Sequence, residues 1–162
     1  MPYVLIPLYN RANAIVAWAK VDASDAALVA GRRWRRTHYG YAISGSRSKG
    51  TDVLMHRLLL GLPHGDRRQG DHRNGDRLDC RRENLRVVTS AQNAQNQAAK
   101  GGTSSHRGVS FRKDTGRWTG YVKVNYRRHC AGCFATEAEA VEAVRALRAQ
   151  LMPYAVPERD AA

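Results

Sequence analysis

The sequence is short of cysteine, of acidic residues and of long apolar runs, and these shortages exclude several classes of protein. It has three cysteines in 162 residues, an odd number that argues against a disulfide framework where no signal peptide is seen. It has no run of about 18 apolar residues, and no charged N-terminal segment leads into a long apolar one. We therefore expect a cytoplasmic protein without a membrane segment.

Two of the cysteines, Cys130 and Cys133, have the CxxC spacing of zinc and redox sites. A zinc finger needs a second pair of ligands, and the chain has neither another CxxC nor a His pair at finger spacing. The sequence therefore gives little support for a zinc site.

Basic residues far outnumber acidic ones, with 27 Lys and Arg against 14 Asp and Glu, a net charge of +13 and a pI of about 10.4. An excess of this size indicates a polyanionic partner. The net charge is +6 over residues 1–50, +3 over 51–100 and +4 over 101–162, so the excess is not confined to one tail. This distribution favours several modules that contact one extended polyanion.

Residues 70–97, GDHRNGDRLDCRRENLRVVTSAQNAQNQ, predict a strand, a turn, a long loop, a second strand and a helix. Asn74-Gly75 is the dipeptide that most readily takes positive φ at both central turn positions, so we expect the chain to reverse there. The apolar residues of 85–88 then predict a strand that pairs with the first.

The helix that follows carries an unexpected polar residue. Thr89 opens a capping box, which predicts a helix over about residues 90–100. Its fourth position would normally hold an apolar partner for the residue before the cap, but here it is Asn93. Facing the hairpin, this amide should lie near Asp71 and His72. An Asp, a His and an Asn brought together can bind one divalent cation and supply one general base.

With this set of residues the chain resembles the HNH homing endonucleases of phage and intron type, which have a ββα-metal nuclease site. The resemblance rests on His56-Arg57-Leu58, Asp71-His72-Arg73-Asn74-Gly75-Asp76, Asn84-Leu85-Arg86-Val87-Val88-Thr89, Asn93 and Asn96-Gln97.

The resemblance implies a role for each of four residues. His72 would be the general base that activates water against a DNA phosphodiester. Asp71 and Asn93 would hold the divalent cation, Mg²⁺ or Mn²⁺. Asn84 would complete the catalytic site as a structural residue, pinning the long loop through backbone hydrogen bonds. Because many members have a final His where this chain has Asn93, it resembles the intron-type subgroup.

The chemistry of these side chains agrees with the resemblance. Phosphodiester hydrolysis needs a cation near the phosphate and a base near neutral pKa, roles that a carboxylate–amide pair and a histidine suit. Neighbours on a regular strand point to opposite faces, so Asp71 and His72 can face one phosphate only if the strand bends, and Gly70 is the expected place. We interpret His56 as a structural residue or a phosphate contact.

Residues 1–50 predict an N-terminal arm of short strands. Segments 3–8 and 14–21 read as a strand pair, Asp22 or Ser24 should cap a short helix, and further strands should follow near Trp34. Its arginines at positions 32, 33, 35 and 36 are interpreted either as phosphate contacts or as a solvated edge that discourages strand aggregation.

Residues 101–105, GGTSS, are the predicted linker, and a second module follows it. Three strands are expected, over 107–112, 118–124 and 127–131. A capping box of Thr136 and Glu139 should then open a helix that packs on the sheet.

Alternation predicts that one sheet face packs on this helix and that cations, hydroxyls and an aromatic ring cover the other. Such a face suits a DNA groove. The segment is similar to the APETALA2-type DNA-binding domain, through Arg107-Gly108-Val109, Gly116-Arg117-Trp118 and Gly132-x-Phe134-x-Thr136-x-x-x-Ala140. The resemblance implies DNA contacts by Arg107, Ser110, Arg112, Tyr121, Lys123, Arg128 and Cys130. Plant members have Arg at position 110 and Trp at position 130, so their target sequence does not carry over.

Together these patterns predict an α+β protein with an N-terminal stranded arm, an HNH nuclease unit and a C-terminal three-stranded antiparallel sheet packed on one helix. The expected divisions are 1–50 for the arm, 51–100 for the nuclease unit, 101–105 for the linker, 106–152 for the DNA-binding domain and 153–162 for a tail. The predicted function is metal-dependent hydrolysis of duplex DNA, with no obligate protein partner. The alternatives are a catalytically inactive DNA-binding regulator and, less well supported, an RNA-binding protein.

Overall fold

The computed structural model describes residues 2–46, 49–96 and 102–155, and it shows a mixed α+β protein, as predicted. The chain forms two compact units, Met1–Thr89 and Ser90–Ala162, and each is described by itself. Within the described ranges, no helix has the length and apolar character needed to cross a bilayer.

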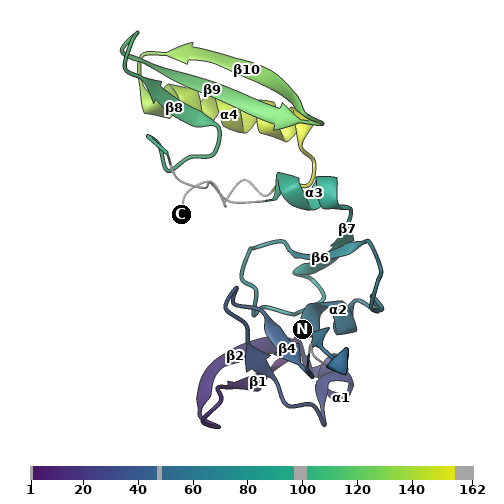
Figure 1. Cartoon of the computed structure of the whole chain (residues 1–162). Coiled ribbons are helices and arrows are strands. Elements are labelled where there is room, and N and C mark those ends of the chain that lie inside the picture. Colours follow the sequence, from purple (N-terminus) through teal and green to yellow (C-terminus); the bar gives the residue numbers. More distant parts are fainter. Residues whose placement is uncertain (1, 47–48, 97–101, 156–162) are drawn as a thin grey trace. The chain divides into compact units, whose positions relative to one another are not determined.

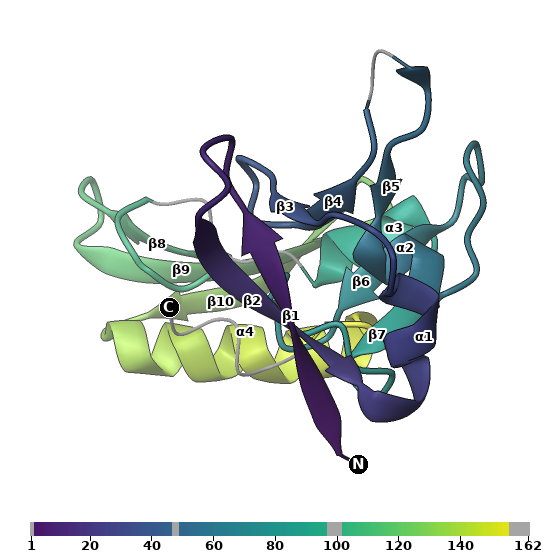
Figure 2. The same cartoon turned by 90° about the horizontal axis from the view of Figure 1, so that it is seen from below.

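The first unit is built on a five-stranded sheet with the order β2-β1-β3-β4-β5. Its strands are β1 (Tyr3–Tyr9), β2 (Ile15–Asp22), β3 (Arg35–Arg36), β4 (Ala42–Ser44) and β5 (Val53–Leu54). Figure 2 shows β1 and β2 side by side, as their antiparallel register requires. Among the described strands of this sheet, β1 and β3 pair in parallel and the other neighbours pair antiparallel. The arginines of β3 therefore lie on a central strand, and the interpretation of this cluster as a protective sheet edge is wrong for Arg35 and Arg36.

Short helices cover this sheet: η1 (Ala23–Asp25), α1 (Ala26–Val29) and α2 (Met55–Leu59). The expected side-chain cap by Asp22 is wrong, because the Asp22 carboxylate instead accepts a hydrogen bond from the Arg82 backbone N–H at 2.7 Å. Apolar side chains of sheet and helices form one core, whose buried members are Leu8, Ala19, Val21, Val29, Trp34, Ala42, Met55, Leu59, Cys80 and Leu85.

The predicted nuclease hairpin is part of the same unit. Strands β6 (Gln69–His72) and β7 (Leu85–Val88) pair antiparallel, and the loop between them docks on β2. Lys20 N–H donates to Leu78 O and Cys80 N–H donates to Lys20 O, both at 2.8 Å. The segments expected as an arm and as a nuclease unit therefore share one hydrophobic core.

The second unit begins with α3 (Ser90–Gln95) and continues as a three-stranded sheet crossed by one helix. The helix begins at the predicted residue, and its expected continuation over 97–100 lies outside the described residues. The sheet has the order β10-β9-β8, with β8 (Val109–Arg112), β9 (Arg117–Val124) and β10 (Arg127–Phe134). Figure 1 shows α4 (Glu137–Leu151) lying across one face of this sheet.

The predicted capping box at the start of α4 is confirmed. The Thr136 side chain accepts from the Glu139 N–H, and Glu139 Oε2 accepts from the Thr136 N–H at 3.1 Å. The helix and the sheet share a buried core of Val109, Val122, Ala140, Val144 and Met152, against which Trp118, Val124, Phe134, Val141 and Leu147 pack.

Candidate active site on the β6–β7 hairpin

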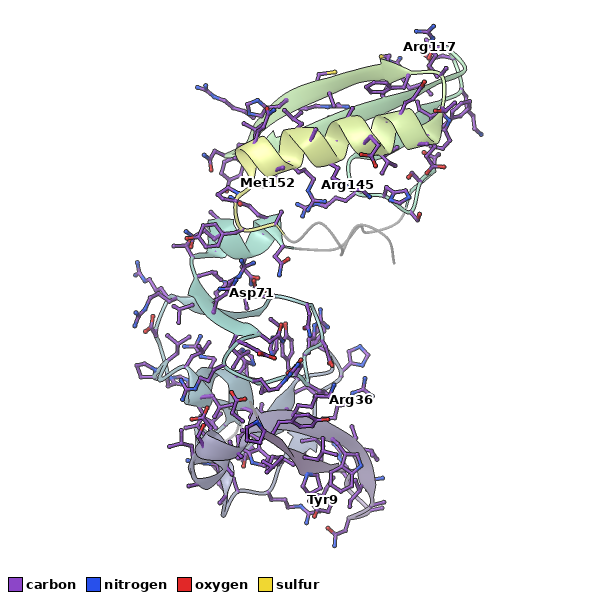
Figure 3. All side chains as sticks on the ribbon, turned by 180° about the vertical axis from the view of Figure 1, so that it is seen from behind. Tyr9, Arg36, Asp71, Arg117, Arg145 and Met152 are labelled. Carbon is purple, nitrogen blue, oxygen red and sulfur yellow. The ribbon has the colours of Figure 1, made fainter. Side chains whose placement is uncertain are left out.

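Asp71 is buried on β6 and is bound by Arg86 from the opposite strand. Arg86 Nε and Nη2 lie 2.8 and 2.7 Å from Asp71 Oδ2, and the two side chains are 12% and 6% exposed. The pairing follows from the register, which sets Asp71 opposite Arg86 and His72 opposite Leu85. Figure 3 marks the position of Asp71. The carboxylate expected to hold a cation is therefore already partly neutralised by a guanidinium.

The expected strand bend at Gly70 is wrong, because the β6–β7 register runs without a shift from Gln69 to His72. Gly70 has a different role. A Cβ at this position would lie 2.5 Å from Cδ2 of His56, so only glycine lets the His56 ring pack against β6. Asp71 and His72 consequently point to opposite faces of the hairpin.

His72 faces inward, and its ring belongs to an aromatic cluster. It is 4% exposed, and its centroid lies 4.9 Å from the His56 ring and 5.9 Å from the Tyr41 ring. Nε2 is 3.9 Å from Cys80 Sγ. Burial lowers the pKa of His72 to about 4, although the negative charges of nearby carboxylates act to raise it. The imidazole is thus neutral at neutral pH, as a general base must be, but its burial counts against a base that acts without rearrangement.

The 5% exposure of His56 favours a structural role over a phosphate contact. Burial, aided by the charges of His72 and Arg57, lowers its pKa to about 3. Its neighbour Arg57 organises the preceding loop, donating to the carbonyls of Arg68, Pro63 and Asp66 at 2.9–3.2 Å. Both residues therefore hold the hairpin in place.

The long loop between β6 and β7 is pinned by the side chain of Asn84. Its Oδ1 accepts from the Asn74 N–H at 2.9 Å, and its Nδ2 donates to Asp79 O at 2.7 Å. The Asp79 carboxylate in turn accepts from Asn74 Nδ2 and from Arg81. These are backbone and loop contacts of the kind that the resemblance implies for Asn84, whose part in catalysis stays a prediction.

The turn within this loop differs from the predicted one. Gly75 N–H donates to His72 O at 3.0 Å, so Arg73 and Asn74 occupy the central positions. Of the dipeptide Asn74-Gly75, only Gly75 has positive φ, at 78°. The expectation of a left-handed conformation at both residues is wrong.

Asn93 lies in α3 and belongs to the second unit, whereas Asp71 and His72 belong to the first. Their convergence stays a prediction. Mg²⁺ is commonly held by one or two carboxylates, with waters and substrate phosphates completing its shell. No three His, Cys, Asp or Glu side chains of the described ranges cluster as metal ligands. The donors therefore fit a sparse magnesium-type site at Asp71 better than a closed cage of the zinc type.

The chain was compared with known protein families, curated proteins and solved structures. Residues 53–95 match the HNH endonuclease family. The matched segment runs from β5 to α3, so the HNH match contains His56, Asp71, His72, Asn84 and Asn93. It supports the nuclease part of the predicted resemblance and leaves the homing type and the C-terminal module as predictions. Neither a curated protein nor a solved structure matches the chain.

The open face of the second unit carries the predicted DNA contacts. The strand register places Thr119, Tyr121 and Lys123 of β9 on the face away from α4. Thr119 pairs with Ser110 of β8, while Tyr121 pairs with Cys130 and Lys123 with Arg128 of β10. The Arg128 guanidinium lies 3.9 Å from the Tyr121 ring centroid. Ser110 Oγ lies 3.1 Å from Thr119 Oγ1, so these hydroxyls bond to each other. Arg112 forms an exposed ion pair with Asp114.

Arg107 differs from the other predicted DNA contacts, because its guanidinium is bound within the protein. Nη2 and Nη1 donate to the carbonyls of Ala94 and Gln95, both at 3.0 Å, at the C-terminal end of α3. Arg148 donates to the same Gln95 carbonyl at 3.3 Å. Arg107 thus fixes the helix that carries Asn93 to the sheet of the second unit.

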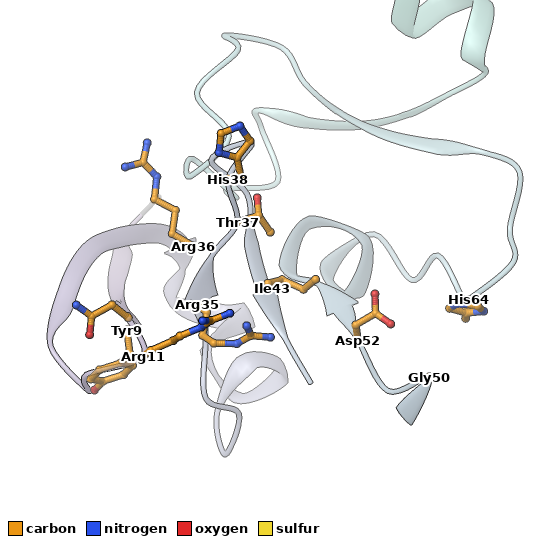
Figure 4. A pocket seen from close by; sticks show the side chains of 11 residues that line it. Tyr9, Arg11, Arg35, Arg36, Thr37, His38, Ile43, Gly50, Asp52 and His64 are labelled. Carbon is orange, nitrogen blue, oxygen red and sulfur yellow. The ribbon is translucent and has the colours of Figure 1, made fainter. Parts of the chain in front are cut away.

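A wide basic pocket lies on the sheet of the first unit, with a volume of about 940 Å³. Figure 4 shows its lining side chains, among them Arg11, Arg35 and Arg36. The ion pairs among the described residues of this unit are made by Arg68, Arg81, Arg82 and Arg86. None of these ion pairs involves the three arginines of the pocket. The pocket is therefore suited to phosphate groups.

Sequence reasoning missed two residues beside the candidate site. The pairing of Arg86 with Asp71 could not be found by counting from the turn, because the long loop over residues 73–84 separates β6 from β7 and leaves their register open. Tyr41, which directly precedes β4, packs on both His56 and His72, and no local sequence pattern predicts that contact.

Proposed function

We propose that the chain is a metal-dependent endonuclease of the HNH homing type that hydrolyses a phosphodiester in duplex DNA. The observation that carries the proposal is the β6–β7 hairpin, which presents Asp71 and His72 on one strand, has its loop pinned by Asn84, and lies within the segment that matches HNH endonucleases. The net charge of +13 supports a nucleic acid as the substrate.

In this proposal Asp71 and Asn93 hold Mg²⁺ or Mn²⁺, which when bound neutralises the charge that grows on the phosphate. His72 takes the proton from the attacking water. Because the ring is 4% exposed and points away from Asp71 on the unbent strand β6, this strand must rearrange when DNA binds to bring both side chains to one phosphate. Asn84 keeps the loop in the shape that positions the hairpin.

DNA is held by two surfaces in this proposal. The open sheet face of the second unit supplies Ser110, Arg112, Tyr121, Lys123 and Arg128, and the basic pocket of the first unit supplies backbone contacts. A β-ribbon fits the major groove, where side chains reach both phosphates and base edges.

The second candidate is a catalytically inactive protein that binds DNA as a regulator. Two observations favour it: the burial of His72 and the engagement of Asp71 by Arg86. The charge and the open sheet face serve this function equally well.

Incubation of the purified chain with supercoiled plasmid, with and without chelator, separates the two functions. Nicking or linearisation in Mg²⁺ or Mn²⁺ that chelator abolishes supports the endonuclease. Plasmid binding without nicking at any concentration of either metal supports the regulator and contradicts the endonuclease.

A further inference from the structure

The turn between β9 and β10 adopts an unfavourable backbone conformation at an exposed residue, Tyr126. Val124 pairs with Arg127, so the turn consists of two residues, Asn125 and Tyr126. Their φ angles are 49° and 65°. Two-residue hairpins with both central residues left-handed favour Asn-Gly, because glycine takes this conformation without steric conflict and asparagine tolerates it. Tyrosine at the second position is disfavoured.

Packing does not explain this tyrosine. Tyr126 is 96% exposed, so its ring gains nothing from burial in the protein. A strained backbone that persists without compensating contacts marks a position that is used for binding or catalysis more often than chance allows.

The charges beside the turn are arranged unfavourably as well. Lys123 and Arg128 are directly opposite each other on the same face, and like charges at such a pair repel. Arg127 is also exposed. In the described part of the second unit the ion pairs are made by Arg112 and Arg145, and none of them involves Lys123, Arg127 or Arg128. A bound polyanion would remove this repulsion.

We propose that the tip of the β9–β10 hairpin enters a groove of duplex DNA, with the Tyr126 ring against the sugars and base edges. Lys123 and Arg128 contact the phosphates on either side. The three side chains combine cations with an aromatic ring, the arrangement that binds nucleic acid through backbone charge and ring contact together. This inference rests on the DNA-binding part of the proposed function and assigns a contact to Tyr126.

The test measures binding of the full chain to a linear duplex DNA fragment in chelator, so that cleavage cannot interfere. Tyr126→Gly relieves the strained turn and should raise Tm, yet it should weaken DNA binding on the order of tenfold, as loss of one aromatic contact does. The slope of log affinity against log salt should not change, because the lost side chain is neutral.

Asn125→Gly is the matched control, since it relaxes the neighbouring residue of the same turn and should leave affinity unchanged. Tyr126→Phe should keep the affinity of the wild type. A Tyr126→Gly variant that binds DNA as tightly as the wild type overturns the inference. If the wild-type protein binds DNA but does not nick plasmid, the nuclease proposal alone is wrong. If it does not bind duplex DNA, both the nuclease proposal and the inference about Tyr126 are wrong.

Discussion

Arg86 binds Asp71 across the β6–β7 hairpin through two nitrogens, with Nε and Nη2 at 2.8 and 2.7 Å from the same oxygen, Asp71 Oδ2. The same carboxylate is the one proposed to hold a divalent cation. A guanidinium and a cation compete for one carboxylate, because each is attracted by its charge and they repel one another. We therefore expect Arg86 to set how strongly Asp71 binds metal.

Removing this competitor should expose the metal affinity of Asp71. Arg86→Ala leaves a buried carboxylate without its main charge partner, and unfolding free energy should fall by about 3 kcal/mol in chelator. Mg²⁺ or Mn²⁺ should then raise the Tm of the variant more than that of the wild type, because bound cation replaces the lost charge. The control is the double variant Arg86→Ala/Asp71→Asn, in which the metal-dependent rise should disappear. An equal rise in the single and double variants would remove Asp71 from the metal site.

The role of His72 can be separated from its role in packing by chemical rescue. His72→Ala should leave DNA binding intact and slow plasmid cleavage in Mg²⁺ by about 10²–10⁴-fold, the usual contribution of a general base. Imidazole added to this variant should restore part of the rate, because the lost ring leaves a space next to His56. His56→Ala opens the same cluster, and imidazole should not restore its cleavage. Cleavage by His72→Ala at the wild-type rate would exclude His72 as the base.

Asp79 should make the first unit sensitive to acid. Its side chain is 1% exposed, and hydrogen bonds from Arg81 lower the pKa of its carboxyl. A carboxyl with a lowered folded-state pKa stabilises the fold above its unfolded pKa, and this stability is lost as pH falls through the folded value. Asp79→Asn should therefore reduce the unfolding free energy at pH 7 by about 1.5–3 kcal/mol.

The measurement is urea unfolding at neutral and acidic pH, where the difference between Asp79→Asn and wild type should shrink on acidification. Asp114→Asn is the control, because Asp114 is exposed and its ion pair with Arg112 is screened by solvent. A difference for Asp79→Asn that stays constant with pH would show that its charge does not stabilise the loop.

The basic pocket of the first unit should contribute phosphate contacts to DNA binding. Arg36 lines the pocket, and Arg32, an exposed arginine of the same segment, does not. Arg36→Gln should lower the slope of log affinity against log salt by about 0.9, the value for one phosphate contact. Arg32→Gln removes the same charge and should change the slope less. Equal changes in the two variants would mean that the pocket adds only diffuse charge.

Local patterns in the sequence were enough to predict several parts of the fold. The alternation of β9 places Val122 inward and Lys123 outward, because a strand beside one helix has one buried and one open face. The Thr136 capping box is likewise decided within one helical turn. These features depend on residues close together in the sequence.

Contacts between distant segments could not be predicted in this way. The His56 ring packs over Gly70, where a Cβ would come within 2.5 Å of it, and the sequence suggested a bend at that glycine instead. The aromatic cluster that buries His72 includes Tyr41, a residue distant in the sequence that directly precedes β4. A left-handed conformation was expected at both Asn74 and Gly75 and occurs only at Gly75, because the loop pinned by Asn84 overrides the dipeptide's own preference.

Arg107 should behave as a structural residue of the second unit, although the family resemblance implies that it contacts DNA. Its guanidinium donates to the Ala94 and Gln95 carbonyls, so Arg107→Gln should lower the unfolding free energy by about 1–3 kcal/mol. Because these donors already have partners, the salt slope of DNA binding should not change. Arg128→Gln is the opposite case: its side chain is on the open face, so the slope should fall by about 0.9 at unchanged stability. An equal fall in the salt slope for Arg107→Gln would show that Arg107 contacts DNA.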